Sequence, residues 1–275
     1  MLPFVAMLML CFWIPGCYSA SKNKPHSHQG MLQPYDGKHI PYTLTPDQNK
    51  KLNAGEPVVI NQRNGKSGRG IVIQDIQAPP HVCIDRISDL RNYHKMVPNV
   101  KNIDIYEENT YPNGTTKVGA MFKVGVSLVT FGYYLRLTYE PKYVSYTWTL
   151  DYQYNSDFDD NTGHWQAMTH PTKPGWTRVL YSTEVKLFSW IPEFVVTFLT
   201  KTALIESTVW VKRESEKQAK ADPSCNEVKQ IDLSACFVEL EDGGARYDTH
   251  CSESAVQKMI EEETKAAEKA EGEEL

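Results

Sequence analysis

The sequence lacks a long apolar run that is free of charge. The best candidate is IPEFVVTFLTKTALIESTVW at residues 191–210, and Lys201 and Glu206 interrupt it. Charged residues near the centre of a membrane span cost about 2.5 to 3.5 kcal/mol each on insertion scales. A helix that covers a protein core can instead turn such residues outward. We therefore expect residues 191–210 to belong to a covering helix.

An excess of positive charge is also missing. The formal net charge is −5, and residues 252–275 hold eight Glu and three Lys, which alone give −5. The rest of the chain sums to zero, so there is no electrostatic case for a nucleic-acid partner. Residues 252–275 contain strong helix formers and almost no apolar stripe, which predicts a solvated extension. No protein partner is evident.

Recognisable catalytic and metal-binding motifs are absent. There is no G-x-S-x-G, no paired histidine spacing, and no C-x-x-C among the later cysteines. We predict no catalytic residue, no metal site and no cofactor. An enzyme of the cyclase or hydrolase type is the alternative, and His164 and His170 are expected to be solvated turn residues. Its candidate residues are His94, Arg136, Asp151, His164, His170 and Glu184.

The first twenty residues carry no charged side chain. An apolar core at residues 2–14, followed by Pro-Gly and small residues, predicts a secretory signal peptide over residues 1–20 and a secreted or lumenal protein. One disulfide could form among the cysteines of the tail, with the pairing left open. Cys83 lies on an apolar helix face and is expected to be a buried thiol. The tail cysteines are Cys225, Cys236 and Cys251.

The chain divides into a flexible lead-in at residues 21–42, a domain at 43–218 with its core at 66–218, and a cysteine-bearing acidic tail at 219–275. A short helix is expected at residues 45–54, because Thr45 can form a capping box with Gln48. The stretch NGKSGRG reads as a flexible loop. It is no phosphate loop, since the required glycine five positions earlier is missing.

Strands and turns alternate through the middle of the chain. A strand at residues 70–78 precedes a helix that Pro98 ends. Half-buried strands with alternating apolar and polar residues follow, and a long helix runs from Pro192 to about residue 218. This order predicts an α+β fold with an antiparallel sheet. The six strands are expected at residues 101–108, 115–130, 133–140, 143–154, 163–169 and 176–188.

Two segments carry a family resemblance. VIQDIQAPPHVCIDRISDLRNYHKMVPNVKNIDIYEE resembles the first part of START-like proteins, and WTRVLYSTEVKLFSWIPEFVVTFLTKTALIESTVWVKRESEK resembles their closing strand and helix. This superfamily includes polyketide cyclase/dehydrase and lipid-transport or coenzyme Q-binding proteins. The resemblance implies a helix-grip fold, in which a curved antiparallel sheet wraps around a long C-terminal helix and encloses a cavity.

That cavity predicts binding and transport of a hydrophobic small molecule, such as a lipid, an isoprenoid, a quinone or a polyketide. We expect the loop at residues 188–192 to gate it and to make transient contact with a membrane. The gate residues are Phe188, Trp190 and Ile191. The expected ligand-binding residues are Phe122, Val124, Leu135, Leu137, Tyr146, Trp148, Val179 and Tyr181 of the sheet, and Phe198, Leu199, Thr202 and Ile205 of the helix.

Overall fold

The computed structural model describes residues 20–222 except 65, 66 and 128, together with residues 237–239 and 245–247. Residues 1–19 of the predicted signal peptide lie outside this part of the chain. So do Cys225, Cys236, Cys251 and the acidic stretch 252–275. The predictions made for these segments stay predictions.

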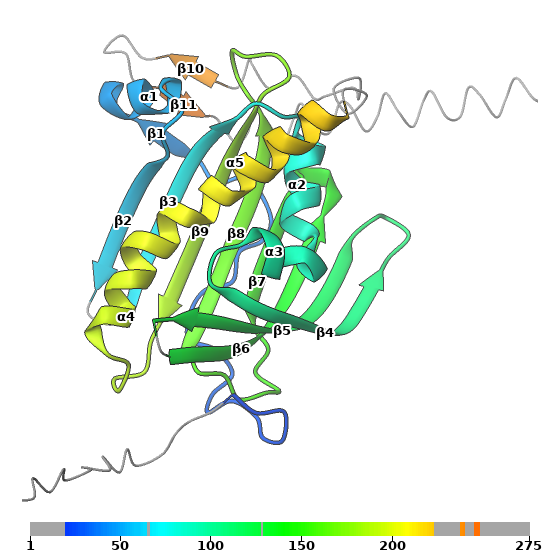
Figure 1. The fold of residues 1–275 in the computed structure, drawn as a ribbon, viewed down its shortest axis with the longest axis vertical. Coiled ribbons are helices and arrows are strands. Elements are labelled where there is room, and N and C mark those ends of the chain that lie inside the picture. Colours follow the sequence, from blue (N-terminus) through cyan, green and yellow to red (C-terminus); the bar gives the residue numbers. More distant parts are fainter. Residues whose placement is uncertain (1–19, 65–66, 128, 223–236, 240–244, 248–275) are drawn as a thin grey trace, which may run out of the picture.

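An antiparallel sheet forms the body of the molecule (Figure 1). Its eight strands follow the order β2-β3-β9-β8-β7-β6-β5-β4, and every neighbouring pair is antiparallel. The predicted α+β fold with a curved antiparallel sheet is confirmed. The strands are β2 Val58–Asn64, β3 Ser67–Ile76, β4 Val100–Thr110, β5 Thr116–Val126, β6 Val129–Glu140, β7 Ser145–Leu150, β8 Asp160–Thr169 and β9 Thr177–Lys186.

All longer helices except α1 lie over one face of this sheet, the inner face. Helix α2 (Pro80–Ser88) is followed by the 3-10 turn Leu90–Asn92 and by α3 (Tyr93–Met96). Cys83 in α2 is fully buried, as predicted, and its burial raises the pKa of the thiol to about 12.

The C-terminal helix crosses the inner face diagonally (Figure 1). It comprises α4 (Glu193–Thr197), a π-helical segment (Phe198–Ala203) and α5 (Leu204–Ala221). Helix α5 contacts β3, β9 and α2, and its Trp210 and Val211 are buried. By length and composition the whole helix could cross a membrane. In the fold it is the covering helix that the sequence predicts.

A second, small sheet joins the start of the predicted domain to two short strands that follow the C-terminal helix in the sequence. Strand β1 (Tyr42–Leu44) pairs with β11 (Ala245–Tyr247), which pairs with β10 (Phe237–Glu239). Helix α1 (Pro46–Asn53) follows β1 directly. The predicted capping box is present, since Thr45 Oγ1 accepts from Gln48 N and Gln48 Oε1 accepts from Thr45 N.

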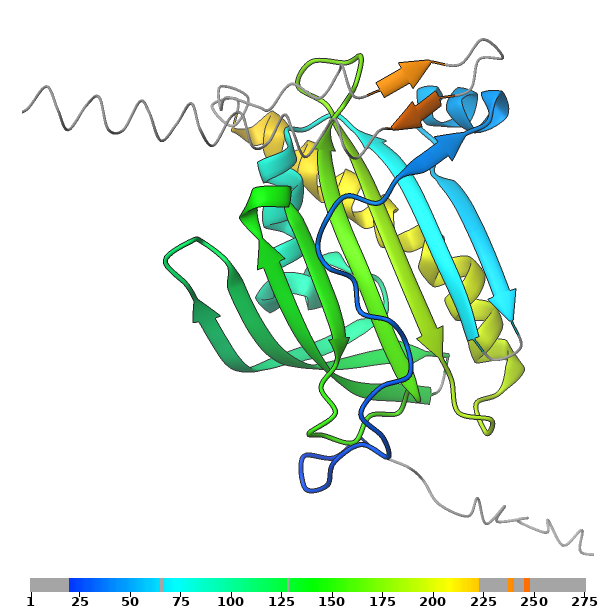
Figure 2. The same ribbon diagram turned by 180° about the vertical axis from the view of Figure 1, so that it is seen from behind.

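The segment at residues 20–41, which covers nearly all of the lead-in predicted at residues 21–42, runs across the outer face of the sheet, opposite the helices (Figure 2). We call it the strap. Its backbone is fastened at several points: Ser21 pairs with Asn155, and the Asp160 carboxylate accepts from Met31 N at 2.5 Å and Leu32 N at 2.9 Å. The expectation of a flexible lead-in is therefore corrected. Few apolar residues hold the strap, so its composition resembled that of a loop.

The stretch NGKSGRG also differs from its prediction. It joins β2 to β3 as a hairpin in which Asn64 pairs with Ser67, and Gly70 pairs with Thr183 of β9. Its glycines suggested a loop. A Cβ on Gly70 would lie 2.7 Å from the side chain of Leu204, so glycine there permits α5 to lie close to the sheet.

Candidate functional site

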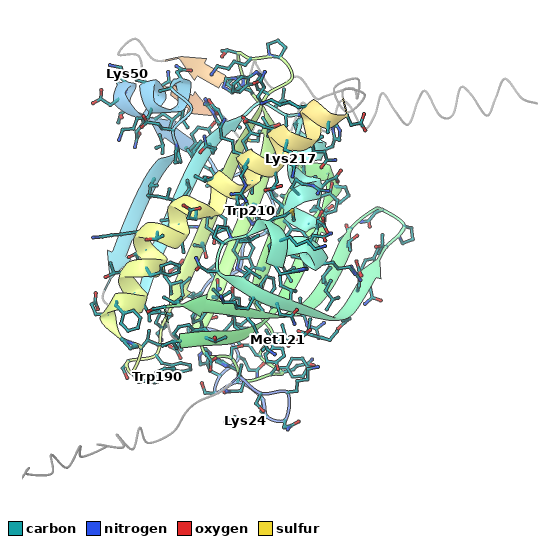
Figure 3. All side chains as sticks on the ribbon, in the orientation of Figure 1. Lys24, Lys50, Met121, Trp190, Trp210 and Lys217 are labelled. Carbon is teal, nitrogen blue, oxygen red and sulfur yellow. The ribbon has the colours of Figure 1, made fainter. Side chains whose placement is uncertain are left out.

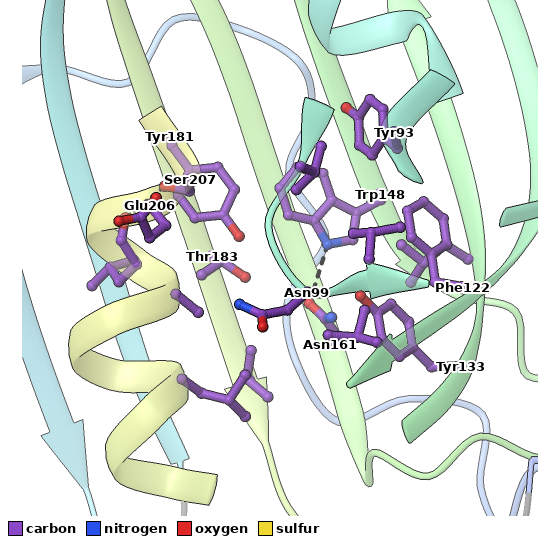
Figure 4. Close-up of a pocket in the computed structure, with 18 of the residues that line it drawn as sticks. Tyr93, Asn99, Phe122, Tyr133, Trp148, Asn161, Tyr181, Thr183, Glu206 and Ser207 are labelled. Atoms are coloured by element: carbon purple, nitrogen blue, oxygen red, sulfur yellow. Dashed lines mark hydrogen bonds between the residues drawn. The ribbon is translucent and has the colours of Figure 1, made fainter. Parts of the chain in front are cut away.

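A pocket of about 220 Å³ lies between the inner face of the sheet and the C-terminal helix (Figure 4). It reaches the surface at Pro98 and Asn99, which are exposed. Most of its wall is apolar or aromatic. The residues that line it are Leu90, Tyr93, Val97, Pro98, Asn99, Val100, Phe122, Val124, Tyr133, Leu135, Leu137, Tyr146, Trp148, Phe158, Asn161, Trp165, Tyr181, Thr183, Val185, Phe198, Leu199, Ala203, Leu204, Glu206, Ser207 and Trp210.

The strand register places Trp148 at the centre of the wall. Trp148 of β7 is paired with Gly163 of β8, and a Cβ on Gly163 would lie 1.9 Å from the indole. Glycine therefore allows the indole to lie across β8. Its Nε1 then donates to Asn161 Oδ1 at 3.1 Å, and Tyr181 stacks on it at 5.7 Å between ring centroids.

Two aromatic pairs stiffen the walls on either side. Phe122 of β5 and Tyr133 of β6 are paired across the strands, and their rings stack at 5.4 Å. Tyr93 and Trp210 meet edge to face at 5.1 Å, which joins α3 to the covering helix. Such pairs contribute about 0.5 to 1.5 kcal/mol beyond burial. The two pairs thus join β5 to β6 and α3 to the covering helix at the walls of the pocket.

The pocket is uncharged apart from one carboxylate. Among the described residues that line it there is no Lys, Arg or His, and Glu206 is the only acid. Burial raises the pKa of Tyr181 to about 12 and also raises the pKa of Tyr133 and Tyr146. These hydroxyls stay protonated at neutral pH and can act as hydrogen-bond donors.

Most residues that the sequence singles out meet in this pocket. Val179 does not line it: this residue is fully buried in the core cluster that also holds Cys83 and Val211. Thr202 and Ile205 do not line it either, because both are exposed on the far side of the helix. The residues that do line it as expected are Phe122, Val124, Leu135, Leu137, Tyr146, Trp148, Tyr181, Phe198 and Leu199.

The spacing of the predicted residues explains the error on the helix. Leu199, Thr202 and Ile205 are separated by two steps of three residues, and six residues place Ile205 about 240° round an α-helix from Leu199. A step of four residues from Leu199 keeps to the inward face. Ala203, Leu204, Ser207 and Trp210 face the pocket instead.

Several lining residues escaped the sequence analysis. Asn161 precedes the strand expected at residues 163–169, because Asp-Asn-Thr-Gly is a strong turn signal, but β8 already begins at Asp160. Thr183 and Val185 lie on the same strand face as Tyr181, so the alternation of β9 would have identified both. Tyr93, Val97 and Asn99 carry no pattern that points to a pocket.

The predicted gate residues do not line the pocket; they lie beside it. Trp190 (labelled in Figure 3) is 48% exposed. Its ring stacks on that of Phe188 with 6.2 Å between the centroids. Phe194, at the start of the helix, is 50% exposed. Ile191 is only 1% exposed and packs in the cluster of Val126, Phe131, Leu187 and Val195. Ile191 therefore anchors the loop and cannot contact a membrane.

None of the six candidate catalytic residues lines the pocket. His94 is exposed on α3, and Asp151 is paired with Arg136 Nε at 2.7 Å. His164 and His170 were expected to be solvated, and both are buried. His164 lies beneath the strap, and Glu184 is half-buried on β9.

His170 belongs to a buried ion pair at the end of the sheet. Its Nε2 lies 2.9 Å from Asp75 Oδ2, and its Nδ1 accepts from Thr172 N and Lys173 N. Arg178 Nε donates to Asp75 Oδ1 at 2.7 Å, and its Nη2 donates to Oδ2 at 2.9 Å. Asp75, His170 and Arg178 are all buried and are hydrogen-bonded to one another, so the arrangement is structural.

One group of side chains has metal-ligand composition: His26, His28 and Asp159. Their hydrogen bonds argue against a metal site. Ser156 N donates to His26 Nδ1 at 3.3 Å, and Gly30 N donates to His28 Nδ1 at 3.0 Å. Each Nδ1 is thus an acceptor, so each Nε2 carries the proton and points it at Asp159.

Several solved structures are similar to this chain. The Zhui aromatase/cyclase from Streptomyces sp. R1128 matches with 12% identity and a TM-score of 0.47, over 60% of this chain and 98% of that one. A START superfamily protein from Mycobacterium smegmatis has 16% identity and a TM-score of 0.45, over 55% and 98%. A STAR-related lipid transfer protein from Xanthomonas axonopodis has 9% identity and a TM-score of 0.45, over 58% and 92%.

No protein-family profile and no curated protein matches the sequence. The structures just named include START and aromatase/cyclase proteins, the groups that two segments of the sequence resemble. At these identities the likeness concerns the fold alone, so the function has to be argued from the pocket of this chain.

Proposed function

We propose that the protein binds a small hydrophobic molecule in the pocket beneath the C-terminal helix and carries it. The observation that supports this is the pocket itself: about 220 Å³ of space, walled mostly by aromatic and aliphatic side chains, between the sheet and the C-terminal helix. Burying about 300 Å² of apolar ligand surface contributes roughly 7 kcal/mol before the costs of association. That is sufficient for a carrier without a charged partner.

A pair of neighbouring substitutions tests binding. Ala203→Trp places a large ring into the pocket, because Ala203 lines it. Thr202→Trp is the matched control, since Thr202 is exposed on the other side of the same turn. Native mass spectrometry of each variant, purified from the protein's own cells, measures the co-purifying ligand. We expect ligand on the wild type and on Thr202→Trp, and none on Ala203→Trp. A wild-type protein without ligand, and without affinity for apolar probes, would refute the proposal.

We propose in addition that Phe188, Trp190 and Phe194 contact a lipid membrane while the ligand is exchanged. We call these three residues the aromatic tip. Trp190 and Phe194 are about half exposed, and Val195 and Val196 behind them are buried in the same helical turn. Tryptophan is favoured at the boundary between water and hydrocarbon. The tip also leads directly into Phe198 and Leu199, which line the pocket.

Vesicle experiments test the aromatic tip. Trp190→Ser combined with Phe194→Ser should reduce co-sedimentation with phosphatidylcholine vesicles and slow transfer of a fluorescent apolar probe between vesicles. Tyr111→Ser is the control, because Tyr111 is equally exposed (46%) but lies on the β4–β5 hairpin. If the double variant transfers the probe as fast as the Tyr111 control does, the membrane contact is refuted.

The predicted signal peptide adds the proposal that binding takes place on the secretory route. Removal of residues 1–20 would take away Ala20, whose backbone N–H is hydrogen-bonded to the Asp157 carboxylate, and would keep the rest of the strap from the pairing of Ser21 with Asn155 onward. The intact mass of the protein from its own cells tests this. A mature chain that still contains residues 1–20 would contradict it.

A further inference from the structure

One polar side chain in the pocket has a fixed orientation and an unused donor. Asn161 is buried, and its Oδ1 accepts the hydrogen bond from Trp148 Nε1 at 3.1 Å. Because an indole nitrogen can only donate, the amide cannot turn over, and its NH₂ group has to point away from Trp148. No described residue accepts a hydrogen bond from Asn161 Nδ2 in this fold.

Other uncharged polar groups converge on the same place. In Figure 4 the side chains of Asn99, Tyr133, Tyr181 and Thr183 turn toward the space in front of Asn161. Thr183 Oγ1 already donates to Thr162 O at 3.2 Å. Asn99 adopts a left-handed backbone conformation (φ 66°) at the mouth, which is where asparagine is better tolerated than most residues. The cavity therefore presents several donors in the middle of an apolar wall.

The described lining of the pocket offers no cation to a negatively charged ligand. This described lining contains no basic side chain, and Glu206 adds an acid. An ionised carboxylate or phosphate that entered the pocket would lose its hydration without an ion partner, which is strongly unfavourable. A carbonyl oxygen loses far less and gains the hydrogen bond from Asn161.

The size of the pocket limits the ligand as well. An engineered cavity of about 150 Å³ in another protein takes up benzene. The 220 Å³ here accordingly suits one to two fused rings or an aliphatic group of similar bulk. A diacyl lipid would exceed this space.

From these observations we infer that the pocket selects an uncharged, ring-sized ligand whose carbonyl-type oxygen accepts a hydrogen bond from Asn161 Nδ2. The inference rests on the proposed function and deepens it. Trp148 is the positioning residue, because its Nε1–H sets the orientation of the amide. Tyr133 and Tyr181 supply further donors for a second oxygen.

Three naphthalenes of nearly equal size test the inference on the whole protein. We use 2-ethylnaphthalene, 2-acetonaphthone and 2-naphthoate, which differ at one substituent: a hydrocarbon, a ketone and an ionised acid. Isothermal titration calorimetry at pH 7.5 measures their affinities. The ketone should bind about three- to tenfold more tightly than the hydrocarbon, as expected for one neutral hydrogen bond. The acid should bind at least about 100-fold more weakly than the ketone.

Two variants locate the effect. Asn161→Leu should remove the preference for the ketone over the hydrocarbon and leave hydrocarbon binding intact. Thr202→Val changes an exposed side chain on the far side of the covering helix and should retain the preference. Binding of 2-ethylnaphthalene reports that each variant is folded.

The outcomes separate the two proposals. If the wild type binds none of the three compounds, the proposed function fails. If it binds the hydrocarbon and the ketone equally, or the acid as tightly as the ketone, only the inference about Asn161 is overturned. A ketone preference that survives in Asn161→Leu would also overturn it.

Discussion

At the scale of single residues, Asp75 and His164 are two buried groups outside the pocket whose pKa values are both lowered. The lower pKa favours the charged form of Asp75 and the neutral form of His164. Burial alone would raise the pKa of Asp75, but hydrogen bonds from Arg178 and His170 lower it to about 2. Neither ring nitrogen of His164 makes a hydrogen bond of normal geometry to a described residue. Burial, aided by the neighbouring His39, lowers the pKa of His164 to about 3.

Removing the Asp75 charge should destabilise the fold strongly. Asp75→Asn leaves Arg178 buried without its counter-ion, and breaking one side of such a pair costs about 3 to 5 kcal/mol. The folded-state pKa is below that of the unfolded chain, so the stabilisation is present above about pH 4 and is lost as the pH falls towards 2. Urea unfolding measures the change. The exposed pair Arg91–Glu108 gives the control Glu108→Gln, which should unfold like the wild type; equal midpoints for all three proteins would contradict the prediction.

His164 should make the fold sensitive to mild acid. Its folded-state pKa of about 3 is below the ordinary histidine value, so between these two values His164 is protonated in the unfolded chain and neutral in the folded protein. As the pH falls from about 6.5 to 3, this group should lower the free energy of unfolding by about 1.4 kcal/mol for each pH unit. His164→Gln should flatten the profile in urea titrations from pH 7 to 5, while His94→Gln, at an exposed site, should not. Parallel profiles for the wild type and His164→Gln would disprove the assignment.

At the scale of elements, the strap depends on a few side chains of the sheet. Asp160 accepts from two strap amides and from Tyr152 Oη at 2.7 Å. Gln166 Oε1 accepts from Ile40 N at 2.8 Å, and Ser145 Oγ donates to Gly37 O at 2.7 Å. Tyr35 Oη lies 2.7 Å from Ser182 Oγ. The strap has no repeating sequence pattern, and separate hydrogen bonds to individual side chains of the sheet hold it in place.

Asp160→Asn should loosen the strap locally. The amide offers one acceptor oxygen in place of a carboxylate, so the amides of Met31 and Leu32 lose their charged partner. Hydrogen exchange followed by mass spectrometry should show faster exchange at residues 31–40, with β5 to β7 unchanged. Asp104→Asn on the exposed part of β4 serves as the reference. Unchanged exchange in the strap would show that Asp160 does not hold it.

These elements also show what the sequence could and could not predict. Alternating strands, Pro192 and the Thr45 capping box each determine local structure, and all three were predicted correctly. Alternation predicted seven of the sheet residues that line the pocket, and it also predicted Val179, which does not line it. The strap and the position of Asn161 could not be predicted, because they depend on contacts with other elements, such as those of Asp160 with the strap and of Trp148 with Asn161. No local pattern encodes such contacts.

At the scale of the whole molecule, the ligand should act as part of the core. A molecule that binds only the folded protein stabilises it by RT ln(1 + [L]/Kd), which is about 2.7 kcal/mol at 100 times Kd. We expect 2-acetonaphthone at that concentration to raise the thermal midpoint of the wild type and of Thr202→Trp. The midpoint of Ala203→Trp should stay constant, because the added indole fills the pocket. Differential scanning calorimetry measures all three; an equal rise in Ala203→Trp would show that the compound binds elsewhere.

The position of the strap also bears on the route by which a ligand could enter the pocket. Since residues 20–41 brace the outside of β7, β8 and β9, those strands are held from behind and have little room to spread apart. We therefore expect any movement that admits a ligand to occur on the opposite side of the sheet, where Asn99 and Leu199 both line the pocket and Asn99 is exposed. The back of the sheet should stay closed while a ligand is exchanged.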